Sequence, residues 1–251
     1  EISLGLVGSE MCIRDRIYNV ASFTKPAGDL PSLLTIDEAR TMYHEFGHAL
    51  HGLLTQCKYK GVSGTSVAQD FVELPSQIME HWAVEPEVLK MYAKHYQTRE
   101  AIPDSLIAKI ENQALFNQGF MTTELLAAAI LDMEMHCLTT MEGFDVLQFE
   151  KQLMDKLGLI PQIAPRYRST YFNHIMGGYA AGYYSYIWAE RLDTDAFEAF
   201  KEHGLFDQAT ATSFRKNILE KGGSDDPMKL YVTFRGAEPS LDALLKTRGL
   251  K

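Results

Sequence analysis

Apolar residues recur at helical spacing between Ile36 and Leu54. Residues three and four apart lie on the same side of an α-helix, and this segment carries Met42, Tyr43, Phe46, Ala49, Leu50, Leu53 and Leu54. Thr35 immediately precedes this segment, and Glu38 comes three residues after Thr35, which is the spacing of a capping box. The pattern therefore predicts a buried helix over residues 36–54.

Helical patterning continues through most of the remaining chain. A second helix is expected from Asp70 to Val84, with Asp70 as its N-cap and Pro75 tolerated near its first turns. The segment Val20–Phe23 is interpreted as a short strand. Further helices are expected over 86–96, 103–138 and 146–157, and then to the C-terminus with breaks near Gly222 and Gly236. No internal repeat or linker divides the sequence, so we expect one mainly α-helical domain over residues 17–251.

Residues 1–16 differ from the sequence that follows. They show no clear hydrophobic period, end in Arg14-Asp15-Arg16, and lack the basic start and long apolar core of a signal peptide. The stretch Gly8–Arg16 resembles a translated sequencing adaptor. We therefore interpret residues 1–16 as a non-native leader, in which Cys12 carries no information about the fold.

Composition narrows the functional classes. Hydrophobic residues make up 46% and charged residues 23% of the 251 positions, the balance of a globular protein. The formal net charge of −9 disfavours nucleic acid and anionic membranes as partners, because no basic field is available to hold phosphates. No apolar run approaches the ~18 residues of a membrane span. Cys12, Cys57 and Cys137 lack metal-binding spacing, and this sparse set argues against a disulfide framework and for a reducing compartment.

Candidate chemistry lies inside the first helix, where His44-Glu45-Phe46-Gly47-His48 forms a His-Glu-x-x-His motif. Two histidines four residues apart can direct their imidazoles at one point, as tetrahedral zinc requires. Glu45 stands beside that point and can accept a proton from an attacking water. Because the motif also occurs by chance, the interpretation depends on a third ligand downstream.

Two residues are candidates for that third ligand. One class of zinc peptidase carries a glycine three residues after the second histidine and a further histidine three residues beyond, but these positions hold His51 and Leu54. The remaining common solution is a glutamate from a following helix. Glu73 and Glu80 both lie on the segment predicted to be that helix, and spacing alone does not separate them.

A second unusual stretch, Tyr171–Trp188, combines glycines with five tyrosines and His174. An aromatic-rich core helix is the simpler interpretation. Glycines, however, let a backbone pass close to a ligand, and tyrosine hydroxyls can donate hydrogen bonds to an oxyanion. Spacings of four and three predict that Tyr179, Tyr183 and Tyr186 share one helix face.

Several separate motifs together resemble the thimet oligopeptidase family of zinc peptidases. The segments similar to that family are Thr41–Gly52, Asp70–Gln77 and His174–Tyr186. Further segments resemble the bacterial dipeptidyl carboxypeptidase (peptidyl-dipeptidase) branch of the family: Ser63–Thr65, Glu80–Ala83, Leu131–Met133, His136–Leu138 and Arg166–Ser169. The resemblance begins near Ile17 and continues to the C-terminus.

The resemblance implies a mainly α, gluzincin-like catalytic domain that binds one zinc ion. Carried over by motif, the family's site residues are the zinc ligands His44, His48 and Glu73, the general base Glu45, the oxyanion donors Tyr183 and Tyr186, and the substrate-binding residues His174 and Tyr179. Asp70 and Glu80 are candidates for orienting a ligand imidazole.

The same resemblance implies hydrolysis of peptide bonds in oligopeptides, with release of C-terminal dipeptides. An endo-acting oligopeptidase with the same zinc site is one alternative. Family members carry a large N-terminal helical half that is absent here, so an inactive truncated fragment is another. A full-length protein is expected to be a cytoplasmic monomer that acts on short peptides. Lys58, Arg166 and Arg168 remain equal candidates for binding the substrate's C-terminal carboxylate.

Overall fold

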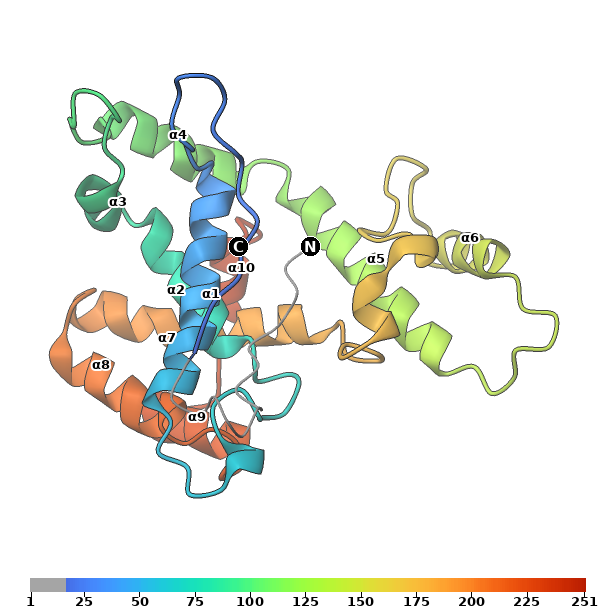
Figure 1. Cartoon of the computed structure of the whole chain (residues 1–251). Helices are drawn as coiled ribbons and strands as arrows, with labels where there is room; N and C mark the ends of the chain where they lie inside the picture. Colours follow the sequence, from blue (N-terminus) through green and yellow to red (C-terminus); the bar gives the residue numbers. More distant parts are fainter. Residues whose placement is uncertain (1–16) are drawn as a thin grey trace.

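The computed structural model describes residues 17–251, and its named secondary structure in that range is entirely helical (Figure 1). The predicted non-native leader, residues 1–16, lies outside the described residues. The mainly α fold class is confirmed. The strand expected at Val20–Phe23 is wrong, because no strand pairs with it; the described backbone pairs only through isolated bridges, Ala27 to Leu30 and Lys94 to Ala101.

Ten α-helices succeed one another in the described residues. Their bounds are α1 Ile36–Leu54, α2 Leu74–Val84, α3 Pro86–Tyr92, α4 Asp104–Leu115, α5 Gln118–His136, α6 Val146–Lys156, α7 Ser185–His203, α8 Gln208–Phe214, α9 Pro227–Arg235 and α10 Leu241–Thr247. A π-helical turn over Arg215–Leu219 continues α8. Short 3₁₀ turns lie at Lys60–Val62, Ser169–Tyr171 and Asn173–Met176.

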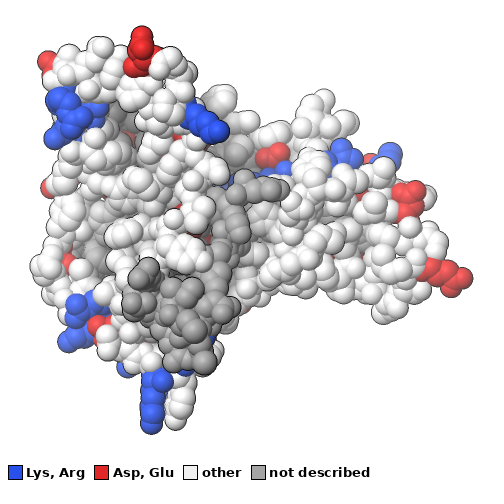
Figure 2. Space-filling view, in the orientation of Figure 1, with Lys and Arg blue, Asp and Glu red and all other residues white. Residues whose placement is uncertain are grey.

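Three further properties concern the same residues, 17–251. No single helix there has the length and apolar composition of a membrane span. Helices α4 and α5 taken together have that length and composition, but a bend of 49° separates them. Cys57 and Cys137 are free thiols. Figure 2 shows basic and acidic side chains at separated positions on the face drawn, without a continuous field of one sign.

Helix α1 begins where the capping box predicted it. Thr35 Oγ1 accepts the Glu38 N–H at 3.1 Å, and Glu38 Oε2 accepts the Thr35 N–H at 2.8 Å. The other Glu38 oxygen accepts the N–H and the hydroxyl of Thr24, both at 2.7 Å. Hydrogen bonds from Thr35 and Thr24 lower the pKa of Glu38 to about 2. They also tie the preceding loop to the helix that carries the histidine motif.

Two helix boundaries differ from the prediction. Helix α2 begins at Leu74 rather than Asp70, with Glu73 at the N-cap position and Pro75 in the first turn, where a missing N–H costs no helical hydrogen bond. The single helix expected over 103–138 is instead two helices. Asn117 adopts left-handed backbone with a φ of 58° and separates α4 from α5.

The helices enclose two clusters of buried side chains. The larger cluster forms where α2 packs against α7 and the C-terminal helices, and its members include Phe71, Leu74, Ile78, Leu192, Phe197, Ile218, Leu230 and Tyr231. The smaller cluster joins α5 to the segment before α7, through Leu125, Ala128, Ala129, Phe172, Ile175 and Tyr183. Figure 1 shows α5 and α6 on one side of the body that α1, α2 and α8 form, with the segment before α7 against α5.

The expectation that α1 is buried on all its apolar positions is wrong. Met42, Phe46 and Leu53 are 43%, 48% and 59% exposed. Helix α1 has apolar residues on more than one face, and α2 covers only the face that carries Gly47, His48 and the other buried positions. The apolar pattern predicted the helix correctly but did not indicate which of its faces packs against another helix.

The crossing of α1 and α2 depends on Gly47. A Cβ at this position would lie 2.1 Å from the carbonyl oxygen of Pro75 and 2.6 Å from Ser76 Cα, so the two backbones are in contact. Gly47→Ala should therefore lower the free energy of unfolding by about 1–3 kcal/mol, the usual range for overpacking, and should move the histidines of α1 away from Glu73. Chemical denaturation measures the first effect. Gly119→Ala, where a Cβ would have no neighbour within 4 Å, is the control, and equal losses in both variants would contradict the backbone contact.

Candidate metal centre

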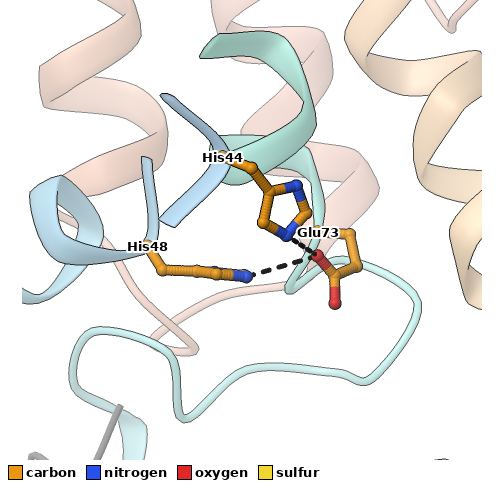
Figure 3. A group of neighbouring side chains, drawn as sticks. All are labelled: His44, His48 and Glu73. Carbon is orange, nitrogen blue, oxygen red and sulfur yellow. Dashed lines mark ion pairs between the residues drawn. The ribbon is translucent and has the colours of Figure 1, made fainter. Parts of the chain in front are cut away.

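Helix α1 and the residue before α2 bring three candidate ligands together (Figure 3). His44 and His48 lie one turn apart on α1, and their rings meet edge to face with centroids 4.9 Å apart. Glu73 precedes α2 and directs its carboxylate at both rings. Each histidine Nε2 lies 3.3 Å from the same oxygen, Glu73 Oε2. The three residues assigned as ligands by resemblance therefore converge.

These separations suit a small tetrahedral cation. Metal–ligand bonds of about 2.0–2.1 Å place two tetrahedral ligand atoms about 3.3 Å apart, and both Nε2–Oε2 separations have that value. The three donor atoms all lie within 4.8 Å of one another. Two imidazoles and one carboxylate are also a donor set of catalytic zinc sites, which keep a fourth position for water or substrate.

Several buried polar atoms at this centre lack a protein partner of normal hydrogen-bond geometry. His48 is 2% exposed, and neither of its ring nitrogens has such a partner among residues 17–251. Glu45 is 6% exposed, and its Oε1 has none either. Leaving a buried polar atom unpaired costs roughly 1–3 kcal/mol. The centre is therefore arranged for a ligand that the described residues do not themselves supply, and a metal ion fits it.

Burial and charge act in opposite directions on the candidate ligands. Burial raises the pKa of Glu73, but His44 and His48 outweigh it and hold that pKa well below its ordinary value. Burial lowers the pKa of His44, whereas the hydrogen bonds to Glu73 and Glu80 raise it to about 10. Glu73 is consequently anionic at neutral pH, the state in which a carboxylate binds a metal ion, whereas His44 would have to release its proton when a metal binds.

Glu80 lies on the other side of His44. Its Oε1 is 2.8 Å from Nδ1 of His44, and its Oε2 is 3.5 Å from the Arg40 guanidinium. A carboxylate at Nδ1 fixes the tautomer and orientation of an imidazole whose Nε2 faces a metal. Of the two glutamates that the sequence left open, Glu73 faces both histidines and Glu80 faces one of them from behind. Asp70 instead accepts the hydroxyl of Tyr184 at 3.0 Å.

Ser76 is a contact that the sequence did not single out. It is fully buried, and its hydroxyl donates to Glu73 Oε2 at 2.8 Å. The Tyr179 hydroxyl donates to the other oxygen, Oε1. Both oxygens of Glu73 are therefore fixed in direction by a neighbouring hydroxyl. The sequence signal was only a serine three residues after a glutamate, a spacing too common at helix starts to be informative.

A set of rings that we call the aromatic wall leads away from Glu73; it consists of Tyr167, His174, Tyr179, Tyr183 and Tyr186. Tyr179 stacks on Tyr186 with centroids 5.1 Å apart, and Tyr186 meets Tyr183 at 5.1 Å. His174 lies 5.4 Å from Tyr183 and 4.8 Å from Tyr167. The four residues predicted from this stretch lie together, and Tyr167 joins them.

The expected reason for this clustering is wrong. Helix α7 begins only at Ser185, and Tyr179 and Tyr183 lie in successive turns before it. Ala181 has a φ of 52° within these turns, a left-handed conformation that is uncommon for a residue with a Cβ. The three tyrosines meet across the turns that lead into α7, and they do not share one helix face.

The protonation states of the aromatic wall favour hydrogen-bond donation. Burial raises the pKa of Tyr179, Tyr183 and Tyr186 above the ordinary value, and the Glu73 charge adds to the effect on Tyr179 and Tyr186. Burial, followed by the charge of Arg166, lowers the pKa of His174. At neutral pH the tyrosine hydroxyls are therefore protonated donors, as a developing oxyanion requires.

The three candidate cations lie in different surroundings. Arg168 Nε donates to the buried carboxylate of Glu150, which also accepts the N–H and hydroxyl of Ser169 at 2.8 Å and 2.7 Å. Lys58 lies over the ring of Tyr59, 5.5 Å from its centroid. Arg166 lies over Tyr167 of the aromatic wall, with the guanidinium 5.9 Å from the ring centroid.

Comparison with known proteins agrees with a peptidase site. The family described as Peptidase family M3 matches residues 5–250. The dipeptidyl carboxypeptidase of Escherichia coli (strain K12) is 47% identical over 237 residues, which are 93% of this chain and 35% of that protein. The oligopeptidase A of the same organism is 41% identical over 237 residues, which are again 93% of this chain and 35% of that protein. The dipeptidyl carboxypeptidase of Salmonella typhimurium is 45% identical over 94% of this chain and 35% of its own length.

The chain spans about a third of the length of these relatives. Within that third, the family match covers nearly every residue that the structure describes, including both histidines of the motif, Glu73 and the aromatic wall. The chain belongs to peptidase family M3.

Proposed function

We propose that this chain carries the catalytic centre of a zinc-dependent peptidase that releases dipeptides from the C-termini of oligopeptides. The observation that carries the proposal is the convergence of His44, His48 and Glu73, with neither ring nitrogen of the buried His48 in a hydrogen bond of normal geometry to the described residues. A zinc ion held there would supply Lewis-acid chemistry, polarising the scissile carbonyl and lowering the pKa of a water toward about 7. Similarity to two dipeptidyl carboxypeptidases supports the dipeptide product.

Glu45 is proposed as the general base. Its side chain is buried beside His44 on α1, and its Oε1 has no competing partner among the described residues. The carboxylate can therefore accept a proton as a water oxygen bonds to the scissile carbonyl carbon. When the carbon–nitrogen bond breaks, the leaving nitrogen needs a proton, and the same carboxyl group can return it.

Tyr183 and Tyr186 are proposed as donors to the oxyanion of the tetrahedral intermediate. A tyrosine hydroxyl is protonated at neutral pH, and burial raises the pKa of both further; one such donor is commonly worth about 10²–10³ in kcat. Tyr179 donates to Glu73, so its proposed role is to hold that carboxylate while its ring lines the substrate subsite. His174, between Tyr167 and Tyr183, is proposed to line the same subsite.

Arg166 is proposed to bind the substrate's C-terminal carboxylate. Arg168 is already engaged by Glu150, and Lys58 lies over Tyr59, outside the aromatic wall. The carboxylate of a departing dipeptide lies about 7 Å beyond the scissile bond. Arg166 lies against Tyr167, and its charge acts on His174. It is therefore next to the aromatic wall that would guide the peptide.

Peptide hydrolysis is best measured in a chimera in which residues 17–251 replace the matching segment of the E. coli dipeptidyl carboxypeptidase, because the chain alone spans 35% of that relative. The chimera should release dipeptides in succession from an unblocked peptide, and amidation of the peptide's C-terminus should abolish release. Arg166→Ala should raise the KM of the unblocked peptide about 10–100-fold, the range for losing a charged hydrogen bond. Lys58→Ala is the matched control, and an unchanged KM in Arg166→Ala would reject this assignment.

Internal cleavage is the second candidate function, favoured by the 41% identity to an oligopeptidase A. An endo-acting enzyme would cut amidated and unblocked peptides at similar rates and yield fragments longer than dipeptides. Mass spectrometry of the products separates the two activities. A zinc-loaded chimera that cleaves neither peptide would contradict the peptidase proposal itself.

A further inference from the structure

Asp132 is a fully buried carboxylate on α5 that takes no part in the metal centre. Its Oδ1 accepts the backbone N–H of Ala181, and its Oδ2 accepts that of Tyr183, both at 2.9 Å. Nδ1 of His136, one turn later on α5, lies 2.9 Å from Oδ1. One side chain therefore joins α5 to the turns before α7, across 49 and 51 residues of sequence.

The two hydrogen bonds are made to a part of the loop whose backbone is strained and closely packed. Ala181 has a φ of 52°, which a residue with a Cβ adopts only at a cost in free energy. Gly182 follows it in a confined position, where a Cβ would lie 3.3 Å from Gln69 Cγ. Helix α7 starts two residues after Tyr183, and a carboxylate near the start of a helix is stabilised by the helix dipole. Asp132 therefore favours this loop conformation over the alternatives open to a glycine-rich segment.

The same turns set the direction of the aromatic wall. Tyr179 and Tyr183 flank Ala181; the Tyr179 hydroxyl donates to Glu73, and the Tyr183 ring contacts Tyr186. Gln77 of α2 holds the other end of the segment, because its Nε2 donates to the carbonyl of Tyr186 at 3.1 Å. The loop is thus fixed from α2 at one end and from α5 in its middle.

We propose that Asp132 is a positioning residue for the aromatic wall: by accepting the N–H groups of Ala181 and Tyr183, it holds the loop in the conformation that directs Tyr179 at Glu73 and Tyr183 at Tyr186. The part of this inference that concerns catalysis rests on the proposed function of these tyrosines. The placement of the oxyanion donors is consequently set by a helix that contributes no candidate metal ligand.

The first test uses the full 251-residue chain and no substrate. Asp132→Asn keeps the shape of the side chain but converts one acceptor oxygen into an NH₂ group that faces a backbone N–H. Amide exchange followed by NMR should show Ala181 and Tyr183 exchanging at least about 10-fold faster than in the unmutated chain, with the amides of α1 unchanged. Asp155→Asn removes an exposed carboxylate paired with Lys151 and is the matched control. Unchanged exchange at Ala181 and Tyr183, or an equal acceleration in α1, would overturn the proposal.

The second test uses the chimera and separates positioning from stability. At saturating zinc, Asp132→Asn should lower kcat up to about 100-fold, as displaced catalytic groups do. Because Tyr179 also holds Glu73 and lines the substrate subsite, zinc affinity and KM should change too, by a smaller factor than kcat. Adding Ala181→Gly should restore part of kcat, because glycine adopts a positive φ freely. A loss of kcat that disappears at saturating zinc would overturn the proposal. If the unmutated chimera cleaves no peptide, the proposed function fails, while the exchange experiment still decides the role of Asp132.

Discussion

Glu73→Ala should remove zinc from this chain. Glu73 is fully buried, and one of its oxygens faces both histidines at 3.3 Å, so no other described carboxylate stands in its position. Loss of a group that merely orients a ligand weakens metal binding about 10–100-fold. Loss of a ligand should exceed that range, and zinc measured after dialysis should fall from one ion per chain to near zero. Glu73→Gln, which fills the same volume without the charge, should also bind zinc more weakly than the unmutated chain.

Glu80→Ala is the control that distinguishes a metal ligand from a residue that only orients one. Glu80 contacts Nδ1 of His44 and not the Nε2 side, so its removal should weaken zinc about 10–100-fold and leave a measurable site. Circular dichroism of the zinc-free variants checks that both remain folded. If Glu80→Ala loses zinc while Glu73→Ala retains it, the assignment of the third ligand is wrong.

Glu45→Gln should separate metal binding from turnover. The amide keeps the size and polarity of the side chain but cannot accept the proton of the attacking water. In the chimera, kcat should fall by about 10²–10⁴, the range attributed to a positioned general base. Zinc content should stay at one ion per chain, because Glu45 is not among the converging donors. Turnover near that of the unmutated chimera would reject Glu45 as the base.

The sequence predicted the part of this site that depends on local periodicity. His44 and His48 converge because four residues make one helical turn, and the Thr35–Glu38 capping box placed the start of that helix. The choice between Glu73 and Glu80 is not local. It follows from the way α2 crosses α1 at the contact between Gly47 and Pro75, which no spacing within either segment encodes.

The aromatic stretch shows the limit of periodicity more clearly. The spacing of Tyr179, Tyr183 and Tyr186 fits a helix, but Ala181 in left-handed backbone ends any helical register before α7 begins. The residue that supports this conformation, Asp132, lies in an apolar run of a different helix. Its partners are backbone N–H groups, which every residue except proline has, so the sequence offered no signal for the pairing.

His44, His48 and Glu73 are proposed to hold one zinc ion together in this chain. Anomalous diffraction at the zinc edge from crystals of the zinc-loaded chain tests this proposal most directly. We expect one strong anomalous peak, about 2.0–2.2 Å from Nε2 of His44, Nε2 of His48 and a Glu73 oxygen. A peak bound through Glu80 or Cys57 without Glu73, or no peak at this centre in saturating zinc, would contradict it.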